Sequence, residues 1–138
     1  LYQIEMTTMA KDNFSFSARL KSFRYAFNGI KTAWQDEHNF RVHSVAAVIA
    51  LILSIILNIS VNEWIAVLFS IGFVFVCELL NTAVENIADF ICNEENPTIK
   101  KIKDVAAAAV MISSITALLV GLLIFIPKLI SFISRYIS

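Results

Sequence analysis

The sequence contains little charge and little of the glycine and proline that shape loops. Of its 138 residues, 16% are charged and 58% are hydrophobic, and there are only three glycines and two prolines. Average soluble domains have roughly 25% charged and 45–50% apolar residues. Because a small protein has a large surface for its volume, a soluble chain of this length could not bury so much apolar area. The composition excludes a soluble monomer and a disordered chain, and it favours an integral membrane protein.

Several common motifs are absent as well. The two cysteines, Cys77 and Cys92, are not in CxxC spacing and predict neither a metal site nor a disulfide framework. The two histidines, His38 and His43, have no metal-binding spacing, so interfacial or hydrogen-bonded roles are expected for them. There is no glycine-rich phosphate-binding loop and no catalytic motif of soluble kinases. Eleven basic and eleven acidic residues give zero net charge, so the bulk charge predicts no nucleic-acid partner.

Three apolar runs are long enough to cross a membrane. The first covers about residues 42–62 and has no Asp, Glu, Lys or Arg. The second begins at Trp64, and its 14 residues before Glu78 rise about 21 Å as a helix, less than the roughly 30 Å of bilayer hydrocarbon. It must therefore continue through Glu78, over about residues 64–90. The third covers about residues 104–127, where Pro127 is expected to end or kink the helix before an amphipathic tail.

The N-terminal part predicts an amphipathic helix over about residues 14–35. Apolar side chains recur there at helical spacing and form one stripe: Phe16, Leu20, Phe23, Phe27, Ile30 and Trp34. Basic side chains lie off that stripe, which is typical of a helix in the membrane interface. Packing of the stripe against other protein is the alternative. Residues 1–13 are expected to be a flexible N-terminus or a cloning remnant, and residues 14–138 to form a single domain.

The basic residues predict the orientation of the spans. Six of them precede residue 42, and three, Lys100, Lys101 and Lys103, lie between the second and third spans, whereas two follow the third. By the positive-inside rule, the N-terminus and the connection that precedes the third span face the cytoplasm. The acidic half of the second span therefore opens on the cytoplasmic side.

Five polar side chains share one face of the second span. At helical spacing they fall within an arc of about 100°: Glu78, Asn81, Thr82, Glu85 and Asp89. Intramembrane carboxylates cost roughly 2.5–3.5 kcal/mol each, so they are expected to be paired, protonated or bound to a cation. A Mg²⁺ ion held by one or two carboxylates and substrate phosphates would keep them ionised, which favours phosphoryl transfer. A polar network that joins helices and an ion pathway are the alternatives.

Two further clusters are expected at the same membrane level. Glu37 and Arg41 precede the first span at i, i+4 spacing, which predicts either a weak surface ion pair or an oxygen cage of Glu37 with Glu85. Lys103 lies at the start of the third span. A lysine at this position predicts a group that binds phosphate, although such lysines also determine the orientation of membrane helices. The meeting of three clusters on one membrane face is the main reason to expect a functional site.

The acidic face carries a resemblance to a known family. The run ELLNTAVE from Glu78 to Glu85, followed by Asp89, resembles the ExxNxAxExxxD signature of the prokaryotic diacylglycerol kinase family. The Lys103–Asp104 pair and the charged pair before the first span fit the same layout. The stretches EHNFRVH and FIPKL make the chain most similar to the undecaprenol kinase branch of that family.

The resemblance implies an all-α integral membrane protein with three transmembrane helices and an N-terminal amphipathic surface helix, assembled as a homotrimer with active sites between subunits. It implies a location in the bacterial cytoplasmic membrane, with the N-terminus and the active site cytoplasmic. The implied activity is ATP- and Mg²⁺-dependent transfer of the γ-phosphoryl group to undecaprenol, giving undecaprenyl phosphate. Diacylglycerol as the acceptor, giving phosphatidic acid, is the alternative within the family. A small ion transporter is the alternative from another class.

The resemblance also implies a role for each matching residue. Glu78 is expected to be the general base that takes the proton of the lipid hydroxyl, and Glu37 and Glu85 are expected to bind the metal. Phe23 is bulkier than the small residue expected at its position, so it is expected to influence which lipid alcohol the site accepts. The residues expected to contact or lie near the nucleotide are Tyr25, Asn81, Glu94, Glu95, Asn96, Lys103 and Asp104.

Overall fold

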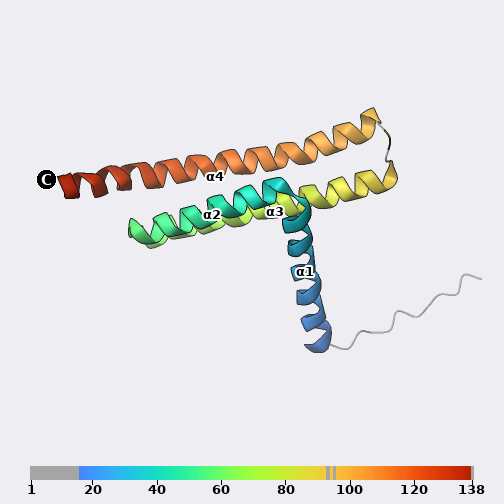
Figure 1. Cartoon of the computed structure of the whole chain (residues 1–138), viewed down its shortest axis with the longest axis horizontal. Helices are drawn as coiled ribbons and strands as arrows, with labels where there is room; N and C mark the ends of the chain where they lie inside the picture. The colour runs from blue at the N-terminus through green and yellow to red at the C-terminus, as the bar shows by residue number, and fades with distance from the viewer. Residues whose placement is uncertain (1–15, 93, 95, 138) are drawn as a thin grey trace, which may run out of the picture.

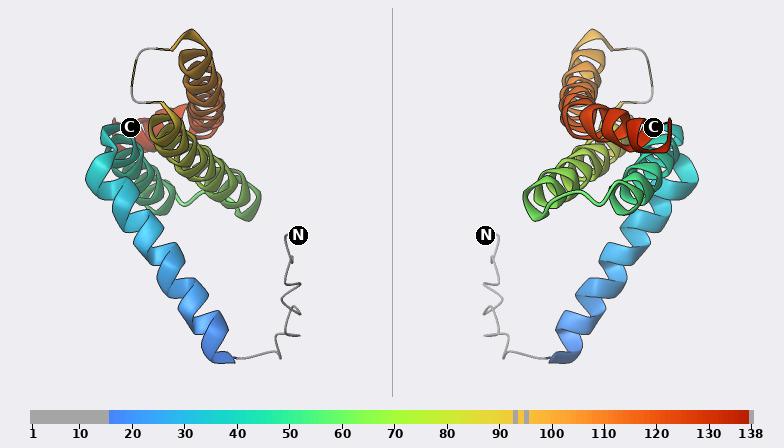
Figure 2. Two further views of the ribbon diagram at one scale, coloured as in Figure 1. Left: turned by 90° about the vertical axis from the view of Figure 1, so that its right-hand side faces the viewer. Right: turned by 90° about the vertical axis from the view of Figure 1, so that its left-hand side faces the viewer.

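The computed structural model describes residues 16–92, 94 and 96–137. These residues form four helices, in the order α1 (Phe16–Asp36), α2 (His38–Ile56), α3 (Val61–Ile91) and α4 (Pro97–Ile137). The axes of helices α2, α3 and α4 are roughly parallel to one line, with consecutive helices in opposite chain directions, whereas the axis of α1 makes a steep angle with them (Figures 1 and 2). The expectations for residues 1–13 and for Glu95 lie outside the described residues.

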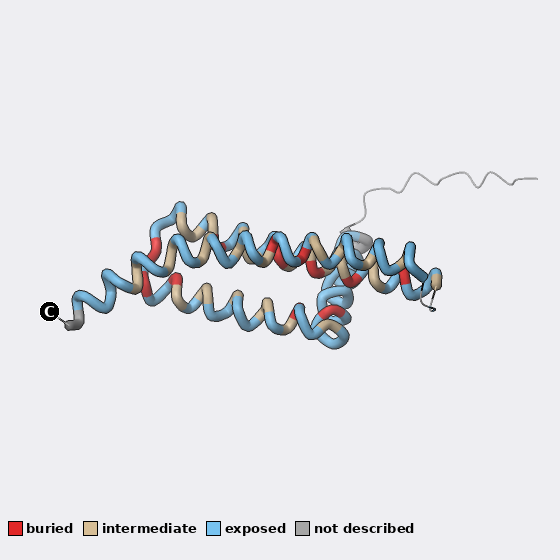
Figure 3. Tube along the Cα trace, turned by 90° about the horizontal axis from the view of Figure 1, so that it is seen from above, coloured by how far each residue is buried: buried red, intermediate tan, exposed pale blue. Residues whose placement is uncertain are grey.

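Three of the four helices are long and apolar enough to cross a membrane, namely His38–Ile56, Val61–Ile91 and Pro97–Arg135. The expected all-helical, multi-pass architecture is confirmed. Most large apolar side chains on these helices are exposed, and buried positions are confined to the places where helices meet (Figure 3). Exposed apolar faces of this extent suit lipid, whose tails are as apolar as leucine.

The corner between α1 and α2 is formed by Glu37, which has an extended backbone (φ −102°, ψ 117°) between the two helices. Arg41 donates hydrogen bonds to the backbone oxygens of Trp34 (3.2 Å) and Gln35 (3.0 Å), at the end of α1. A basic side chain at this place satisfies carbonyl groups that have no partner within the helix. The surface ion pair of Glu37 and Arg41, one of the two arrangements expected here, does not form as a direct contact among the described residues, because the guanidinium binds the backbone.

The turn between α2 and α3 is longer than the sequence suggested, because α2 ends at Ile56 and not near residue 62, whereas α3 begins at Val61. Asn58 has a positive φ of 46°, a conformation that asparagine adopts readily just after a helix. Ser60 and Glu63 then form a capping box: the Ser60 amide donates to Glu63 Oε2 (2.6 Å) and the Glu63 amide donates to Ser60 Oγ (3.4 Å). This reciprocal pair begins α3 at Val61.

Helices α3 and α4 pack along each other in opposite directions and are joined by an ion pair near each end. Lys103 Nζ lies 2.7 Å from Asp89 Oδ1, and Lys128 Nζ lies 3.1 Å from Glu63 Oε2. The two lysines are separated by about 37 Å of helix, slightly more than the thickness of the bilayer hydrocarbon. Helix α4 has no charged residue between Val105 and Pro127, so its uncharged part matches that thickness.

Pro127 lies inside α4, which continues to Ile137. Of the two outcomes expected at this proline, an end of the helix is therefore wrong, and a kink was the other. Proline removes one backbone donor and crowds the carbonyl four residues earlier. Membrane-spanning helices tolerate this loss where neighbouring helices and local adjustment satisfy the freed groups.

Candidate active site

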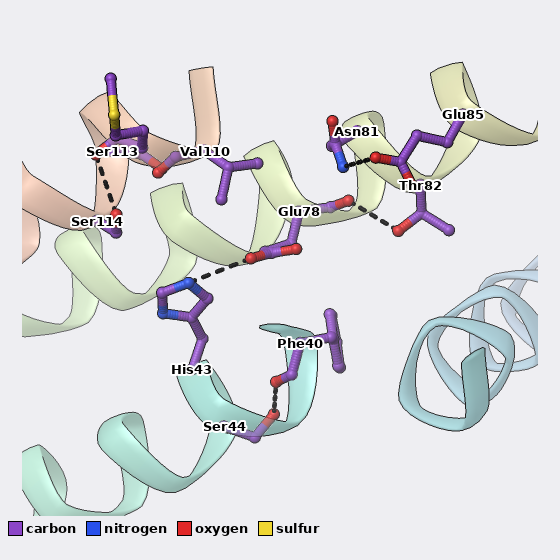
Figure 4. Close-up of polar contacts among 11 residues, drawn as sticks. Phe40, His43, Ser44, Glu78, Asn81, Thr82, Glu85, Val110, Ser113 and Ser114 are labelled. Carbon is purple, nitrogen blue, oxygen red and sulfur yellow. Dashed lines mark hydrogen bonds and ion pairs between the residues drawn. The ribbon is translucent and has the colours of Figure 1, made fainter. Parts of the chain in front are cut away.

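Glu78 lies near the middle of α3 and is the most deeply buried acidic side chain among the described residues, with 2% of its surface exposed. One helical turn later, the Thr82 hydroxyl donates to the backbone oxygen of Glu78 (3.0 Å). The Thr82 hydroxyl therefore binds the backbone of α3 and not the Glu78 carboxylate, which faces the start of α2 (Figure 4). A carboxylate buried among apolar helices is costly unless it has a partner.

His43, from the first turns of α2, supplies that partner. Its Nε2 atom lies 3.2 Å from Glu78 Oε1 (Figure 4). The approach is close enough for an ion pair, but its direction is not that of a hydrogen bond, so Glu78 Oε1 has no hydrogen-bond partner among the described residues. Asn81 Oδ1, also buried, lacks one too. Two orphaned oxygens on neighbouring turns of α3 indicate a place for a ligand, a metal or water.

Glu85 lies two turns beyond Glu78, where Asn81 Nδ2 donates a hydrogen bond to Glu85 Oε1 (3.0 Å; Figure 4). Glu37, at the corner before α2, is close enough to be repelled by the Glu85 carboxylate. Burial is the largest cause of the raised pKa of the Glu37 carboxyl, and repulsion from Glu85 is the next. Asp36 adds to this rise, and Arg41 opposes it.

Glu37 and Glu85 supply only part of the ligands that a divalent cation needs. Within the described part of the chain, no three Asp, Glu, His or Cys side chains lie together as a ready metal cage. Two neighbouring carboxylates, one of them oriented by Asn81, are nevertheless the protein ligands that Mg²⁺ takes when substrate phosphates and water complete its shell. Glu85 thus lies within electrostatic range of Glu37 and accepts a hydrogen bond from Asn81, and Glu78 lies one turn before Asn81 on α3.

Lys103, expected to clamp phosphate, is paired with Asp89 across the α3–α4 interface. The Asp89 side chain is 56% exposed, so the pair lies at the water-facing end of the two helices. An exposed ion pair is weak and can open for a competing anion. Asp104 is exposed on the next position of α4.

The other residues expected near the nucleotide are more dispersed. The Asn96 side chain accepts hydrogen bonds from the backbone amides of Thr98 (2.9 Å) and Ile99 (3.4 Å), which makes it the N-cap of α4. Glu94 is exposed in the connection before it. Tyr25 is 69% exposed on α1, whose first half stands away from the bundle (Figure 2). Within one chain, Tyr25 is therefore separate from the glutamate cluster.

A cavity of about 630 Å³ lies between α2, α3 and α4. Among the described residues that line it, only His43, Ser70 and Ser114 have polar side chains; the rest are aliphatic, aromatic or glycine. The lining runs along α2 from Val42 to Leu53, so one end of the cavity reaches His43 and, through it, Glu78. The arrangement joins an apolar space to a buried carboxylate.

Two roles were not assigned to residues from the sequence. His43 was expected only to lie at the interface or to form a hydrogen bond, and its contact with Glu78 depends on how α2 and α3 pack. Asn96 was read as part of a nucleotide site, although asparagine followed by proline is a common start of a helix. The Ser-x-x-Glu spacing at Ser60 is likewise a signal of the capping box that begins α3.

Comparison with known proteins places this site in a family. The sequence model for prokaryotic diacylglycerol kinase matches residues 24–125, which include α2, α3 and the spanning part of α4. The chain belongs to this family. Membership makes it a membrane lipid kinase.

Individual relatives in the prokaryotic diacylglycerol kinase family differ in name. The chain is 41% identical over 109 residues to the undecaprenol kinase of Bacillus subtilis, an alignment that covers 79% of this chain and 89% of the relative. It is 34% identical over 113 residues to a diacylglycerol kinase of Synechocystis, covering 81% and 65%. It is 30% identical over 111 residues to the diacylglycerol kinase of Escherichia coli K12, covering 80% and 91%.

Proposed function

We propose that the chain transfers the γ-phosphoryl group of ATP to undecaprenol and so produces undecaprenyl phosphate. The observation that carries the proposal is the buried Glu78 carboxylate, which His43 connects to the apolar cavity between the three spans. A long apolar alcohol with one hydroxyl suits such an arrangement. The higher identity to the undecaprenol kinase than to the diacylglycerol kinases supports this choice of acceptor.

In this reaction the oxygen of the lipid hydroxyl attacks the γ-phosphorus. The bond between that phosphorus and the bridging oxygen of ADP breaks, and ADP leaves. Glu78 is the general base: its carboxylate takes the hydroxyl proton as the new oxygen–phosphorus bond forms. Since the side chain is almost fully buried, water is kept away from the proton transfer.

The donor set supports a magnesium site at Glu37 and Glu85. Asn81 orients Glu85 through its amide hydrogen bond, as residues that bond to metal ligands do in metal sites. Mg²⁺ bound there together with ATP would neutralise charge on the phosphates. Lys103 would exchange Asp89 for a phosphate oxygen, with Asp104, Glu94, Glu95 and Asn96 near the nucleotide.

Tyr25 belongs to the same nucleotide site in this proposal but comes from a different subunit. The first half of α1 stands away from the α2–α4 bundle of its own chain, and its large apolar side chains are exposed. A homotrimer with sites between subunits would bring α1 of one chain beside α3 of another. The apolar stripe of α1 would lie in the cytoplasmic face of the bacterial inner membrane, as the excess of basic residues on that side predicts.

Diacylglycerol is the second candidate acceptor, because the family and several relatives carry its name. Ion transport is a weaker alternative: a pathway across the membrane needs polar groups at both ends, whereas the described carboxylates of this cluster lie toward one end of the bundle. The two lipid acceptors differ in their polar ends, since diacylglycerol carries ester groups beside its hydroxyl and undecaprenol does not.

The test is a competition between the two lipids. The purified full chain, in mixed micelles, receives radiolabelled Mg·ATP with equimolar undecaprenol and diacylglycerol. We expect label in undecaprenyl phosphate in clear excess over phosphatidic acid. A preference for diacylglycerol would overturn the choice of acceptor, and transfer to neither lipid would overturn the proposed reaction.

A further inference from the structure

The proposed reaction assigns no role to His43. It belongs to α2, its side chain is 25% exposed, and it both lines the apolar cavity and approaches Glu78 Oε1 at 3.2 Å. Glu78 itself does not line the cavity. The imidazole therefore adjoins both the cavity and the buried carboxylate, and Figure 4 shows its approach to Glu78.

The charges around Glu78 give His43 a particular importance. The other charged groups that act on Glu78 are Glu37 and Glu85, and both are carboxylates that repel it. Among the described basic side chains nearby, Arg41 is bonded to backbone oxygens and Lys103 to Asp89. His43 is thus the group of opposite charge, when protonated, that faces the Glu78 carboxylate.

The carboxylate is otherwise weakly held. Thr82 bonds to the backbone oxygen of Glu78 and not to its side chain. Oε1 has no hydrogen-bond partner among the residues that the structure describes. Without His43, a charged side chain on a membrane-spanning helix would have neither a fixed orientation nor a partner, and leaving a buried charge unpaired is expensive.

We propose that His43 is a positioning residue for Glu78, an inference that rests on the proposed kinase function. The imidazole holds the carboxylate in one orientation beside the end of the cavity that His43 lines, where the acceptor hydroxyl arrives. It acts through Glu78 and has no part in nucleotide binding, which the proposed site assigns to Glu37, Asn81, Glu85 and the start of α4.

The first test compares the two histidines of the chain. His43→Gln removes the charged partner and keeps a polar side chain, whereas His38→Gln changes an exposed histidine of the same helix. We expect His43→Gln to lower kcat by roughly 10- to 100-fold, less than the roughly 10²- to 10⁴-fold effect of a general base. The KM for Mg·ATP should stay near that of the parent chain, whereas the thermal unfolding temperature should fall because the Glu78 charge loses its partner. His38→Gln should match the parent chain in all three measurements.

The second test asks whether His43 acts through Glu78. Glu78→Asp, His43→Gln and the double variant are compared in a double-mutant cycle of kcat. We expect the double variant to lose clearly less than the product of the two single losses. As an independent measurement, added imidazole should raise the kcat of His43→Ala and leave that of His38→Gln unchanged.

The outcomes separate this inference from the function on which it rests. If the parent chain phosphorylates neither lipid, the proposed function fails. If it does so and His43→Gln keeps the parent kcat, or raises the KM for Mg·ATP as much as it lowers kcat, the positioning role is wrong. Losses that multiply in the double variant, with no rescue by imidazole, would also overturn it.

Discussion

At the residue scale, the molecule depends on a few charges placed in an apolar chain. Glu78 is 2% exposed on a helix whose preceding 14 residues carry no charge. Such a group is expensive in a membrane, by roughly 2.5–3.5 kcal/mol. Glu63, on the same helix, is instead satisfied by the Ser60 cap and by Lys128. The two glutamates therefore make a matched pair for testing function against stability.

The first prediction uses this pair. Glu78→Gln keeps the size of the side chain but removes its basicity, so kcat for lipid phosphorylation should fall by roughly 10²- to 10⁴-fold. Nucleotide affinity, measured by titration calorimetry, should change little, because Glu37 and Glu85 remain. Glu63→Gln should keep kcat and lower the thermal unfolding temperature. Full activity of Glu78→Gln would remove Glu78 from the mechanism.

The second prediction concerns the metal. Asn81→Ala removes the amide that orients Glu85, and the loss of a hydrogen bond to a metal ligand typically weakens metal affinity by roughly 10- to 100-fold. The Mg²⁺ concentration for half-maximal activity should rise by that amount, and by more in Glu85→Ala. Asn86→Ala, an exposed asparagine of the same helix, is the control and should leave it unchanged. An unaltered Mg²⁺ requirement in Glu85→Ala would contradict the assignment.

The polar face was predictable from the sequence because helical geometry fixes it. Glu78, Asn81 and Glu85 lie on neighbouring turns of α3 wherever the helix packs. The hydrogen bond of Asn81 to Glu85 also follows from their i, i+4 spacing. The partner of Arg41 was not predictable, since a guanidinium could bind a carboxylate or the carbonyl groups at the end of α1. His43 approaches Glu78 through the packing of α2 on α3, which no local spacing encodes.

At the scale of helices, the ends of α3 and α4 differ from the predicted spans for local reasons. The three apolar runs identified the spans, but hydrophobicity does not mark where a helix begins. Ser60 with Glu63 begins α3 three residues before Trp64, and Asn96 begins α4 at Pro97, seven residues before Asp104. These caps were readable as short motifs, whereas the continuation of α4 through Pro127 depends on surroundings that the sequence does not display.

The third prediction separates the capping role of Asn96 from a nucleotide contact. Asn96→Asp and Asn96→Ser retain a side-chain acceptor for the Thr98 amide, so both should keep the parent stability. Asn96→Ala should lower stability by about 1 kcal/mol, the usual effect of losing an N-cap. Unfolding in detergent and the KM for ATP are measured together. If all three substitutions raise the KM for ATP and none lowers stability, Asn96 acts on the nucleotide and not as a cap.

At the scale of the whole molecule, one chain assembles only part of the proposed site. Glu37, Glu78 and Glu85 come together at the start of α2 and along α3, whereas Tyr25 lies on a helix that departs from them (Figure 2). Several large side chains of α1, including Phe23 and Phe27, are more than 60% exposed. In the proposed trimer, lipid would cover one side of this helix and a neighbouring subunit would cover another.

The fourth prediction tests whether a second subunit supplies Tyr25. Glu78→Gln and Tyr25→Ala are purified separately, unfolded, mixed in equal amounts and refolded together. If α1 of one chain completes the site of another, random assembly makes about one quarter of the sites intact, with Glu78 from one variant and Tyr25 from the other. Activity should then rise to about that fraction of the parent, while each variant refolded alone stays well below it. Activity equal to the mean of the two variants would place Tyr25 in the site of its own chain. A Tyr25→Ala chain as active as the parent would remove Tyr25 from the site altogether.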